Sequence, residues 1–317
     1  MARHTFDVTH RSGQVIDPVL TNLAVDYKPK GLIADILTPP IPVQKESGQY
    51  NVWDARNNFA SDVDPLLPDR TPTKEIGVGL SQDKYFCDEY ALKASISRRE
   101  RDNTDDILRL REKKMNAVQF QLALAREVRV ATMLTKTTSG GQLNLGATPS
   151  KNWNEDEGVI ESDIKTAKEA IYDALGIEPN TIVIPYKVAS AISLQKAIRE
   201  ILKYTVNGQQ ILMEGEAILP ATLWGLKVVI PRGRRITSKE GQTNVFTDIW
   251  GDDVRVLYVG EASTEEPSVA HTFTCRGWET KRWEDDDPEV EWVRTSQLVD
   301  EKVVAADAGY EIKDVLS

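Results

Sequence analysis

The chain has 317 residues, with 39 Lys and Arg against 49 Asp and Glu, three His and two Cys. This length suggests two domains, or one large domain with extensions. Hydrophobic residues make up 40% and charged residues 28%, close to ordinary globular usage, which excludes disordered and fibrous classes. The net charge of −10 argues against a general nucleic-acid binder, which needs a basic surface to neutralise phosphates.

No apolar stretch approaches the ~18 residues of a membrane span, and the N-terminal residues carry no apolar signal segment. We therefore expect a soluble protein that is made in the cytosol and has no membrane partner. Cys87 and Cys275 lie far apart in the sequence, which argues against a disulfide scaffold and against thiolate metal sites. Both are expected to be small buried hydrophobic residues in a reducing compartment.

The N-terminal residues 1–38 lead into the sequence TPPIP, in which Pro39, Pro40 and Pro42 favour extended backbone. The apolar residues of this segment are too few to form a core of their own. The segment is therefore predicted to be an arm that lies on another surface.

The next segment indicates a protruding hairpin. Residues 49–53 (QYNVW) read as a strand, and residues 74–96 as one long returning strand or two. Between them, residues 54–73 show no periodicity and contain three prolines. A structureless stretch of about 20 residues is uncommon inside a compact domain, and a hairpin alone is marginally stable. We infer that another surface, that of a second subunit, orders this hairpin.

A long helix is predicted from about Thr104 to Thr135, because no Gly or Pro occurs between Thr104 and Gly140. Asn103 or Thr104 is the expected N-cap, with Asp105 and Asp106 in the first turn. The apolar residues form two stripes, which indicates packing on both sides of the helix. One stripe consists of Ile107, Leu108, Met115, Val118, Leu122 and Met133, and the other of Leu110, Ala117, Phe120, Leu124 and Val128.

Residues 181–262 are predicted to form a compact α/β module. Before it, a connector (139–150) leads to a helix that is expected to begin at Ser162, with Asp163 in its first turn, and to end at Gly176. From about Ala270 the sequence is again typical of strands, which are expected to rejoin the sheet beside the long helix. Within the module we expect a strand at 181–185, a helix at 187–204 and strands at 223–231, 244–250 and 254–260.

The sequence contains no motif that indicates catalysis. Nucleotide-binding glycine motifs, zinc motifs and the nucleophile-elbow motif are all missing from it. His271 is expected to be structural, and the Asp252–Asp253 pair to lie in a turn. The acidic run Glu284–Asp287 favours a solvated turn over a calcium site. We therefore expect no cofactor and no metal.

One cluster of cations and several tryptophans favour a role in contacts between subunits. Arg232, Arg234 and Arg235 follow a strand, where pairing with the acidic surface of an identical neighbour is favoured over binding of phosphate. Trp53 lies at the hairpin entry, and Trp is enriched at interface hot spots.

The order of arm, hairpin, long helix and α/β module resembles the major capsid proteins of tailed bacteriophages, which have the Hong Kong ninety-seven fold. Residues 22–54 look like the arm-to-hairpin entry of that family. NTIVIPYKVASAIS and ATLWGLKVVIP look like strands of its A-domain, and VVAADAGYEIKDVL like its closing segment. The resemblance spans nearly the whole chain.

The resemblance implies an α+β fold with an N-terminal arm (1–40), an extended E-loop hairpin (41–95), a P-domain with the spine helix (96–180), an A-domain (181–262) and a return to the P-domain (263–317). It implies a non-enzymatic subunit of hexamers and pentamers in an icosahedral virion shell around double-stranded DNA. Portal, scaffolding and decoration proteins are further implied partners. The implied contacts between subunits are Trp53, Arg56, Phe59, Leu66, Leu67, Arg70, Arg232, Arg234 and Arg235, and the residues implied to face the DNA are Arg3, His4 and Arg11.

Two other functions stay open at this point. An encapsulin, a protein cage of the same fold that packages enzymes, would share every feature above. A protein of another class, a soluble α/β enzyme, would use the 181–262 module with Asp252 or Asp253 as its acid. The missing nucleophile and base speak against the enzyme.

Overall fold

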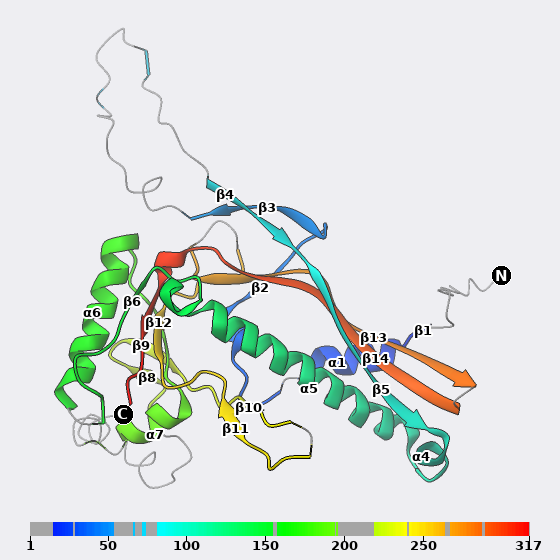
Figure 1. Ribbon diagram of the computed structural model, residues 1–317. Helices are drawn as coiled ribbons and strands as arrows, with labels where there is room; N and C mark the ends of the chain where they lie inside the picture. Colours follow the sequence, from blue (N-terminus) through cyan, green and yellow to red (C-terminus); the bar gives the residue numbers. More distant parts are fainter. Residues whose placement is uncertain are drawn as a thin grey trace.

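A computed structural model describes residues 15–27, 29–53, 66, 72–73, 81–154, 157–193, 195, 219–239, 241–263, 267–286 and 289–316. A long curved sheet runs beside helix α5, and an α/β module lies at one end of this pair (Figure 1). The described base of a hairpin lies above the long sheet in the same view. No helix in these ranges is long and apolar enough to cross a membrane.

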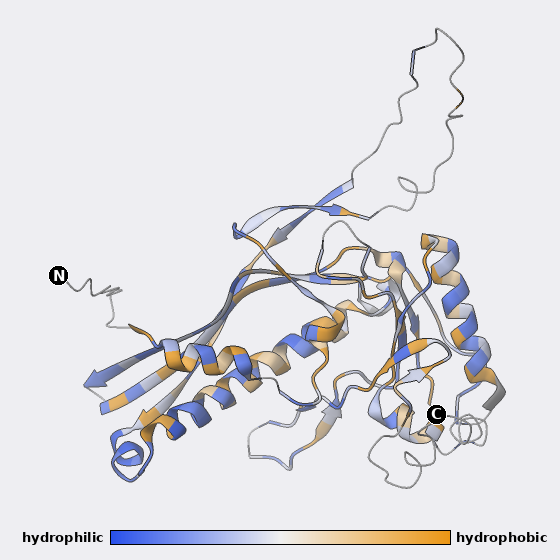
Figure 2. Cartoon of the chain, turned by 180° about the vertical axis from the view of Figure 1, so that it is seen from behind, coloured by the Kyte–Doolittle hydropathy of each residue, from blue (hydrophilic) through white to orange (hydrophobic). Residues whose placement is uncertain are grey.

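The long sheet is built around two antiparallel strands, β13 (Ala270–Asp286) and β14 (Glu289–Val303). Strand β5 (Asp88–Ser97) pairs with the outer side of β14, while β1 (Val15–Ile16) and β2 (Pro40–Pro42) pair with β13. The strands predicted after Ala270 are thus confirmed, and they lie beside the long helix as expected. Their outer tip is hydrophilic (Figure 2).

The long helix is α5 (Ile107–Met133), which at 27 residues is roughly 40 Å long. Its predicted cap was wrong, because the Asp106 carboxylate accepts from the backbone N–H of Arg109 at 3.1 Å. The preceding residues form a separate short helix, α4 (Arg98–Asp102). Ser97 and Glu100 close a reciprocal capping box there, so this turn ends before α5 begins.

Within the described residues, the first stripe of α5 is covered from Met115 onward, whereas Ile107 and Leu108 at its start are exposed and Leu110 of the second stripe packs on the same cluster as Met115. Met115, Val118 and Leu122 are buried. Met115 packs with Ile96 and Val293 of the sheet and with helix α1 (Pro18–Asp26). The predicted arm therefore lies on its own chain here, through Leu20 and Ala24 of α1. On the second stripe, Ala117 and Phe120 are exposed and Leu124 and Val128 are half-buried.

The α/β module contains a second sheet in the order β6-β15-β12-β7-β9-β8. Its parallel centre is β7 (Thr181–Val183) beside β9 (Leu226–Val229). Strand β12 (Val254–Leu257) pairs with β7, and β8 (Thr222–Leu223) with β9. The strands β6 (Leu145–Ala147) and β15 (Gly309–Ile312) also belong to this sheet, although both come from outside residues 181–262.

In the part of the module that the structure describes there are two helices. Helix α6 (Glu157–Leu175) begins before the predicted Ser162, because Ile160 extends the buried stripe of Ile164, Ala167 and Ile171 by one turn. It ends at Gly176, as predicted, in a left-handed conformation with φ of 70°. Helix α7 (Tyr186–Ser193) covers the first part of the predicted helix 187–204, and residues 196–204 lie outside the described ranges. The closing 3-10 turn η2 (Ala306–Ala308) precedes β15.

The described base of the hairpin consists of β3 (Ser47–Val52) and β4 (Ser81–Phe86) in antiparallel register. Two tyrosines fix it to the long sheet. The rings of Tyr50 and Tyr85 lie 5.0 and 4.7 Å from that of Phe273. Gly48, opposite Tyr85, leaves the room that this ring needs, since a Cβ there would lie 2.5 Å from the Tyr85 hydroxyl.

Replacing Phe273 with Ala should lower the free energy of unfolding by about 3–5 kcal/mol, because the ring is 1% exposed and its loss leaves a cavity. We expect amide hydrogen exchange to quicken most in β3 and β4, which would lose their anchor. Phe86→Ala, whose side chain in the same hairpin is 62% exposed, is the matched control and should change stability by less than about 1 kcal/mol. Equal exchange in hairpin and module would contradict the anchor role.

Candidate functional site

The predicted contact residues fall into three groups. Arg232, Arg234 and Arg235 lie together in the loop after β9 and in β10 (Arg234–Ile236), which pairs with β11 (Phe246–Asp248). Trp53 packs against the main core of its own chain, and Leu66 is 68% exposed. The other predicted residues lie outside the described ranges, namely Arg3, His4, Arg11, Arg56, Phe59, Leu67 and Arg70.

Arg232 and Arg234, but not Arg235, line a cavity of about 320 Å³ beside the start of α7. Asp248 accepts two ion pairs there, at 2.8 Å from Arg234 and 2.8 Å from Lys187. The Arg232 guanidinium lies 5.7 Å from the ring centre of Tyr186. Sequence reasoning missed Lys187 and Asp248 because they are 61 residues apart and only the β7–β9 pairing brings their segments together. Asp248 contacts raise the pKa of Lys187, so this ammonium stays charged.

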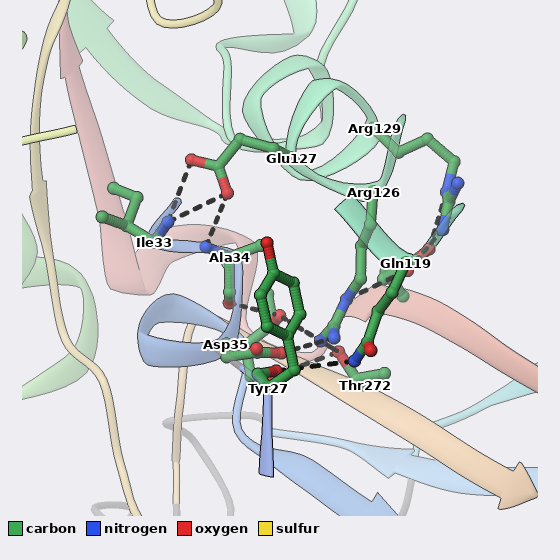
Figure 3. A network of polar contacts seen from close by, with 11 residues as sticks. Tyr27, Ile33, Ala34, Asp35, Gln119, Arg126, Glu127, Arg129 and Thr272 are labelled. Carbon is green, nitrogen blue, oxygen red and sulfur yellow. Dashed lines mark hydrogen bonds and ion pairs between the residues drawn. The ribbon is translucent and has the colours of Figure 1, made fainter. Parts of the chain in front are cut away.

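A buried carboxylate, Glu127, joins this loop to the arm and to α5. It is 0% exposed and accepts hydrogen bonds from the backbone N–H groups of Ile33 and Ala34 at 2.8–3.1 Å. It also accepts from the indole N–H of Trp250 at 2.7 Å. Figure 3 shows Glu127 above the start of α2 (Ala34–Leu37), with Arg126 on the neighbouring position of α5. Burial raises the pKa of Glu127 although these donors favour its charged form.

The same turn of α5 holds the arm to the long sheet. Arg126 pairs with Asp35 and donates to the hydroxyl of Thr272 in β13 at 2.9 Å. Arg129 makes a two-pronged contact with Glu301 of β14, at 3.1 and 2.8 Å. Two turns earlier, the Gln119 amide donates to the carbonyl of Ala24 at 2.6 Å. These contacts, drawn in part in Figure 3, hold the arm against this part of the helix.

Close backbone packing completes this arm–helix junction. A Cβ at Gly233 would lie 3.1 Å from Leu32 and 3.2 Å from Ile249. Gly31, at φ +85°, places its carbonyl 3.0 Å from the N–H of Arg232, which donates to it. The positive φ favours glycine at Gly31, and at Gly233 a larger residue would require Leu32 and Ile249 to shift. The basic loop is thereby held against the arm.

A second buried charged group, Arg255, contacts the C-terminal end of α5. Arg255 of β12 is 2% exposed and donates to the carbonyl of Leu134, the C-cap residue that follows the helix, at 2.8 Å. Its guanidinium lies 3.5 Å from Asp253 and 3.7 Å from Glu311. Burial lowers the pKa of Arg255, and the two carboxylates oppose that shift. The α/β module is thus fixed to the helix by a cation that caps its C-terminal carbonyls.

The remaining candidates have structural contacts. Asp253 accepts from the backbone N–H of Asp314 at 3.0 Å, in addition to its ion pair. The acidic run from Glu284 was expected to form a solvated turn, but up to Asp286 it continues strand β13, where Asp286 pairs with Glu289 of β14. Cations of α4 offset the charge of this segment. Arg101 and Arg98 lie 3.2 and 2.7 Å from Glu284 and Glu289. In the described ranges no three His, Cys, Asp or Glu are grouped to hold a metal ion.

The two cysteines, 188 positions apart in sequence, meet in the cluster under the hairpin base. Cys87 is 3% exposed, and its thiol donates to the Phe273 carbonyl at 3.5 Å. Burial raises the pKa of Cys87 to about 11, so the group is an unreactive thiol at neutral pH. Cys275 is half-buried, and both are free. The expectation of small buried hydrophobic residues is confirmed for Cys87.

Removing the Glu127 carboxylate by Glu127→Ala should lower the free energy of unfolding by at least about 3 kcal/mol, because three buried N–H donors lose their acceptor. The free energy of unfolding of Glu127→Gln should lie between that of Glu127→Ala and that of the wild type, because the amide keeps one acceptor oxygen. Chemical denaturation of the isolated subunit measures this. Gln121→Ala, on the exposed face of the same helix, is the control, and an equal loss there would contradict the role of Glu127.

His271 should make stability depend on pH. It is 0% exposed, and both ring nitrogens lack a hydrogen-bond partner within the described part of the chain. Burial lowers its folded-state pKa, so on acidification the unfolded chain takes up the proton first. Its stabilising contribution is complete above about pH 6.5 and is lost as the pH falls below that value.

We therefore expect His271→Leu to flatten the loss of stability between about pH 7.5 and 5.5, where one differential proton gives at most about 1.4 kcal/mol per pH unit. Thermal unfolding of both proteins across this range measures the slopes. Parallel curves would show that His271 does not carry the dependence.

No protein-family model matches the chain. It is 27% identical to the "Major capsid protein" of Burkholderia phage BcepMu over 95% of this chain and 97% of that protein. A phage-related protein from Bordetella bronchiseptica superposes with a TM-score of 0.72 at 25% identity, over 95% of this chain and 98% of that one. The capsid of cyanophage P-SCSP1u gives a TM-score of 0.58 at 13% identity, over 97% and 92% of the two chains.

These similarities run over nearly the whole chain and agree with the order of arm, hairpin base, long helix and α/β module described above. Sequence and fold together confirm the resemblance seen in the sequence, and the chain is a phage-type major capsid protein with the Hong Kong ninety-seven fold.

Proposed function

We propose that identical copies of the chain assemble into hexamers and pentamers of an icosahedral phage head that encloses double-stranded DNA. The observation that carries this is the second stripe of α5, where Phe120 is 37% exposed beside the exposed Ala117. An apolar stripe on a central helix needs a partner, and the described residues of one chain leave this part of the second stripe uncovered. A neighbouring subunit covers it.

The proposed role is structural and places the protein in the virion after synthesis in the host cytoplasm. The buried polar groups described above hold elements together, and none of them lies at a cavity with a nucleophile beside a base. A catalytic role for Asp253 finds no support, because its carboxylate already pairs with Arg255 and with the backbone of Asp314.

The finer partners are proposals from the family resemblance. Portal, scaffolding and decoration proteins would contact the shell, and Arg3, His4 and Arg11 would face packaged DNA. The division into arm, E-loop, P-domain and A-domain at residues 40, 95, 180 and 262 is likewise proposed. The hairpin residues Trp53, Arg56, Phe59, Leu66, Leu67 and Arg70 would contact a neighbouring subunit.

The fold alone would also fit a cage that packages enzymes. The similarity to a phage major capsid protein over 95% of this chain favours the phage head. Particles that contain DNA support the head, whereas particles that contain a protein cargo support the cage.

Deleting residues 56–72 tests the assembly role of the hairpin. We expect a folded subunit, with a melting temperature within a few degrees of the wild type, that forms no shells in electron micrographs. This follows because the described base of the hairpin is anchored by Tyr50 and Tyr85, whereas the deleted residues are proposed to contact other chains. An unfolded variant would show that these residues belong to the subunit's own core.

A further inference from the structure

Two cavities of opposite charge lie at opposite ends of the α/β module. Strands β7 and β9 are parallel, so the residues before both strands gather at one end and the residues after both at the other. Glu178 precedes β7 and Trp224 precedes β9, and both line a groove of about 450 Å³. Lys187 and Arg232 follow the same two strands and line the cavity of about 320 Å³ described above.

The first site, here called the acidic groove, lies between α6 and the β8–β9 turn. Its carboxylates outnumber its cations, which are Lys165 and Lys168. Both lysines are engaged, Lys165 with Glu169 at 3.7 Å and Lys168 with the carbonyl of Trp224 at 3.3 Å. The carboxylates that line the groove are Glu161, Glu169, Asp173 and Glu178.

Three of these carboxylates remain without an ion pair. Glu161, Asp173 and Glu178 are exposed and take part in no ion pair within the described ranges. An aromatic surface lies beside them, formed by Tyr172, which is 54% exposed, and by Trp224. Carboxylates next to aromatic faces are the surroundings that a guanidinium group prefers.

The second site, here called the cationic cavity, has the opposite composition. Lys187, Arg232 and Arg234 line it with one carboxylate, Asp248, and Asp252 also lies close enough to act on Lys187. Arg234 and Lys187 share Asp248, whereas Arg232 lies beside the ring of Tyr186 and makes no ion pair within the described residues. The cavity therefore presents unneutralised positive charge.

We propose that the cationic cavity of one subunit binds the acidic groove of the next subunit within a ring of identical copies. The inference rests on the proposed function and names the two surfaces that join neighbours in one capsomer. A ring needs a head-to-tail interface, which joins two different patches at separate places on the subunit, whereas a twofold dimer uses one patch twice. The module carries such a pair, with complementary charge.

The net charge of −10 gives this pairing its importance. Subunits of like charge repel each other in solution, so association requires local complementarity. Arg232 and Arg234 would pair with Asp173 and Glu178, and the guanidinium planes would stack on Tyr172 and Trp224. The junction of Gly31 with Arg232 keeps the basic loop in place before the neighbour arrives, which limits the ordering cost.

A charge-swap experiment tests the pairing. The cationic variant carries Arg232→Glu and Arg234→Glu, the acidic variant carries Asp173→Arg and Glu178→Arg, and the swapped variant carries all four changes. We expect each of the first two to reduce the yield of shells at least ~10-fold, and the swapped variant to recover it to within ~3-fold of the wild type. Sedimentation and electron microscopy measure the yield, and melting temperatures exclude unfolded variants.

The double variant Arg99→Glu, Lys313→Glu is the control for net charge, because both side chains are exposed and lie outside both sites and away from the second stripe of α5. It should assemble like the wild type. Normal assembly of the cationic or the acidic variant would overturn the pairing, as would a folded swapped variant that is no better than its two parents. If the wild type forms no shells at all, the proposed function itself fails, which is a distinguishable result.

Discussion

The carboxylate of Glu127 holds together parts of the chain that lie 94 residues before it and 123 residues after it. From the middle of α5 it accepts hydrogen bonds from the arm and from the loop that leads out of β11. A buried carboxylate is costly to desolvate, so it is tolerated only while its donors stay in place. The positions of the arm and of the module relative to the helix are therefore coupled, since both depend on the same two oxygen atoms.

This coupling extends to the surfaces that we propose to face other subunits. The basic loop with Arg232 packs on Gly31, two residues from the Glu127 contacts, while Arg126 and Arg129 tie the same turn of α5 to the long sheet. The hairpin base is fixed separately, through Tyr50 and Tyr85 on Phe273. These contacts fix the basic loop and the hairpin base to the rest of the subunit, which would reduce the entropy lost if copies associate through them.

Local signals predicted the elements that depend on neighbouring residues. The long helix followed from the lack of Gly and Pro, and the strands after Ala270 from their alternation. The cap of α5 was missed because Ser97 and Glu100 form their own turn first. Glu127, Lys187 and Asp248 could not be found in this way, since each reads as an ordinary surface charge until distant segments meet. The contact of Cys87 with Phe273 was hidden for the same reason.

Strand β15 lies between β12 and β6, and β14 lies between β13 and β5. Both sheets therefore take interior strands from the last sixth of the chain. During synthesis, the long sheet cannot close before β14 is complete at Val303, and the module sheet cannot close before β15 is complete at Ile312, although the arm and α5 are made long before. A chain truncated before β14 would lack the strand that lies between β13 and β5 as well as β15, so we expect it not to reach the folded form.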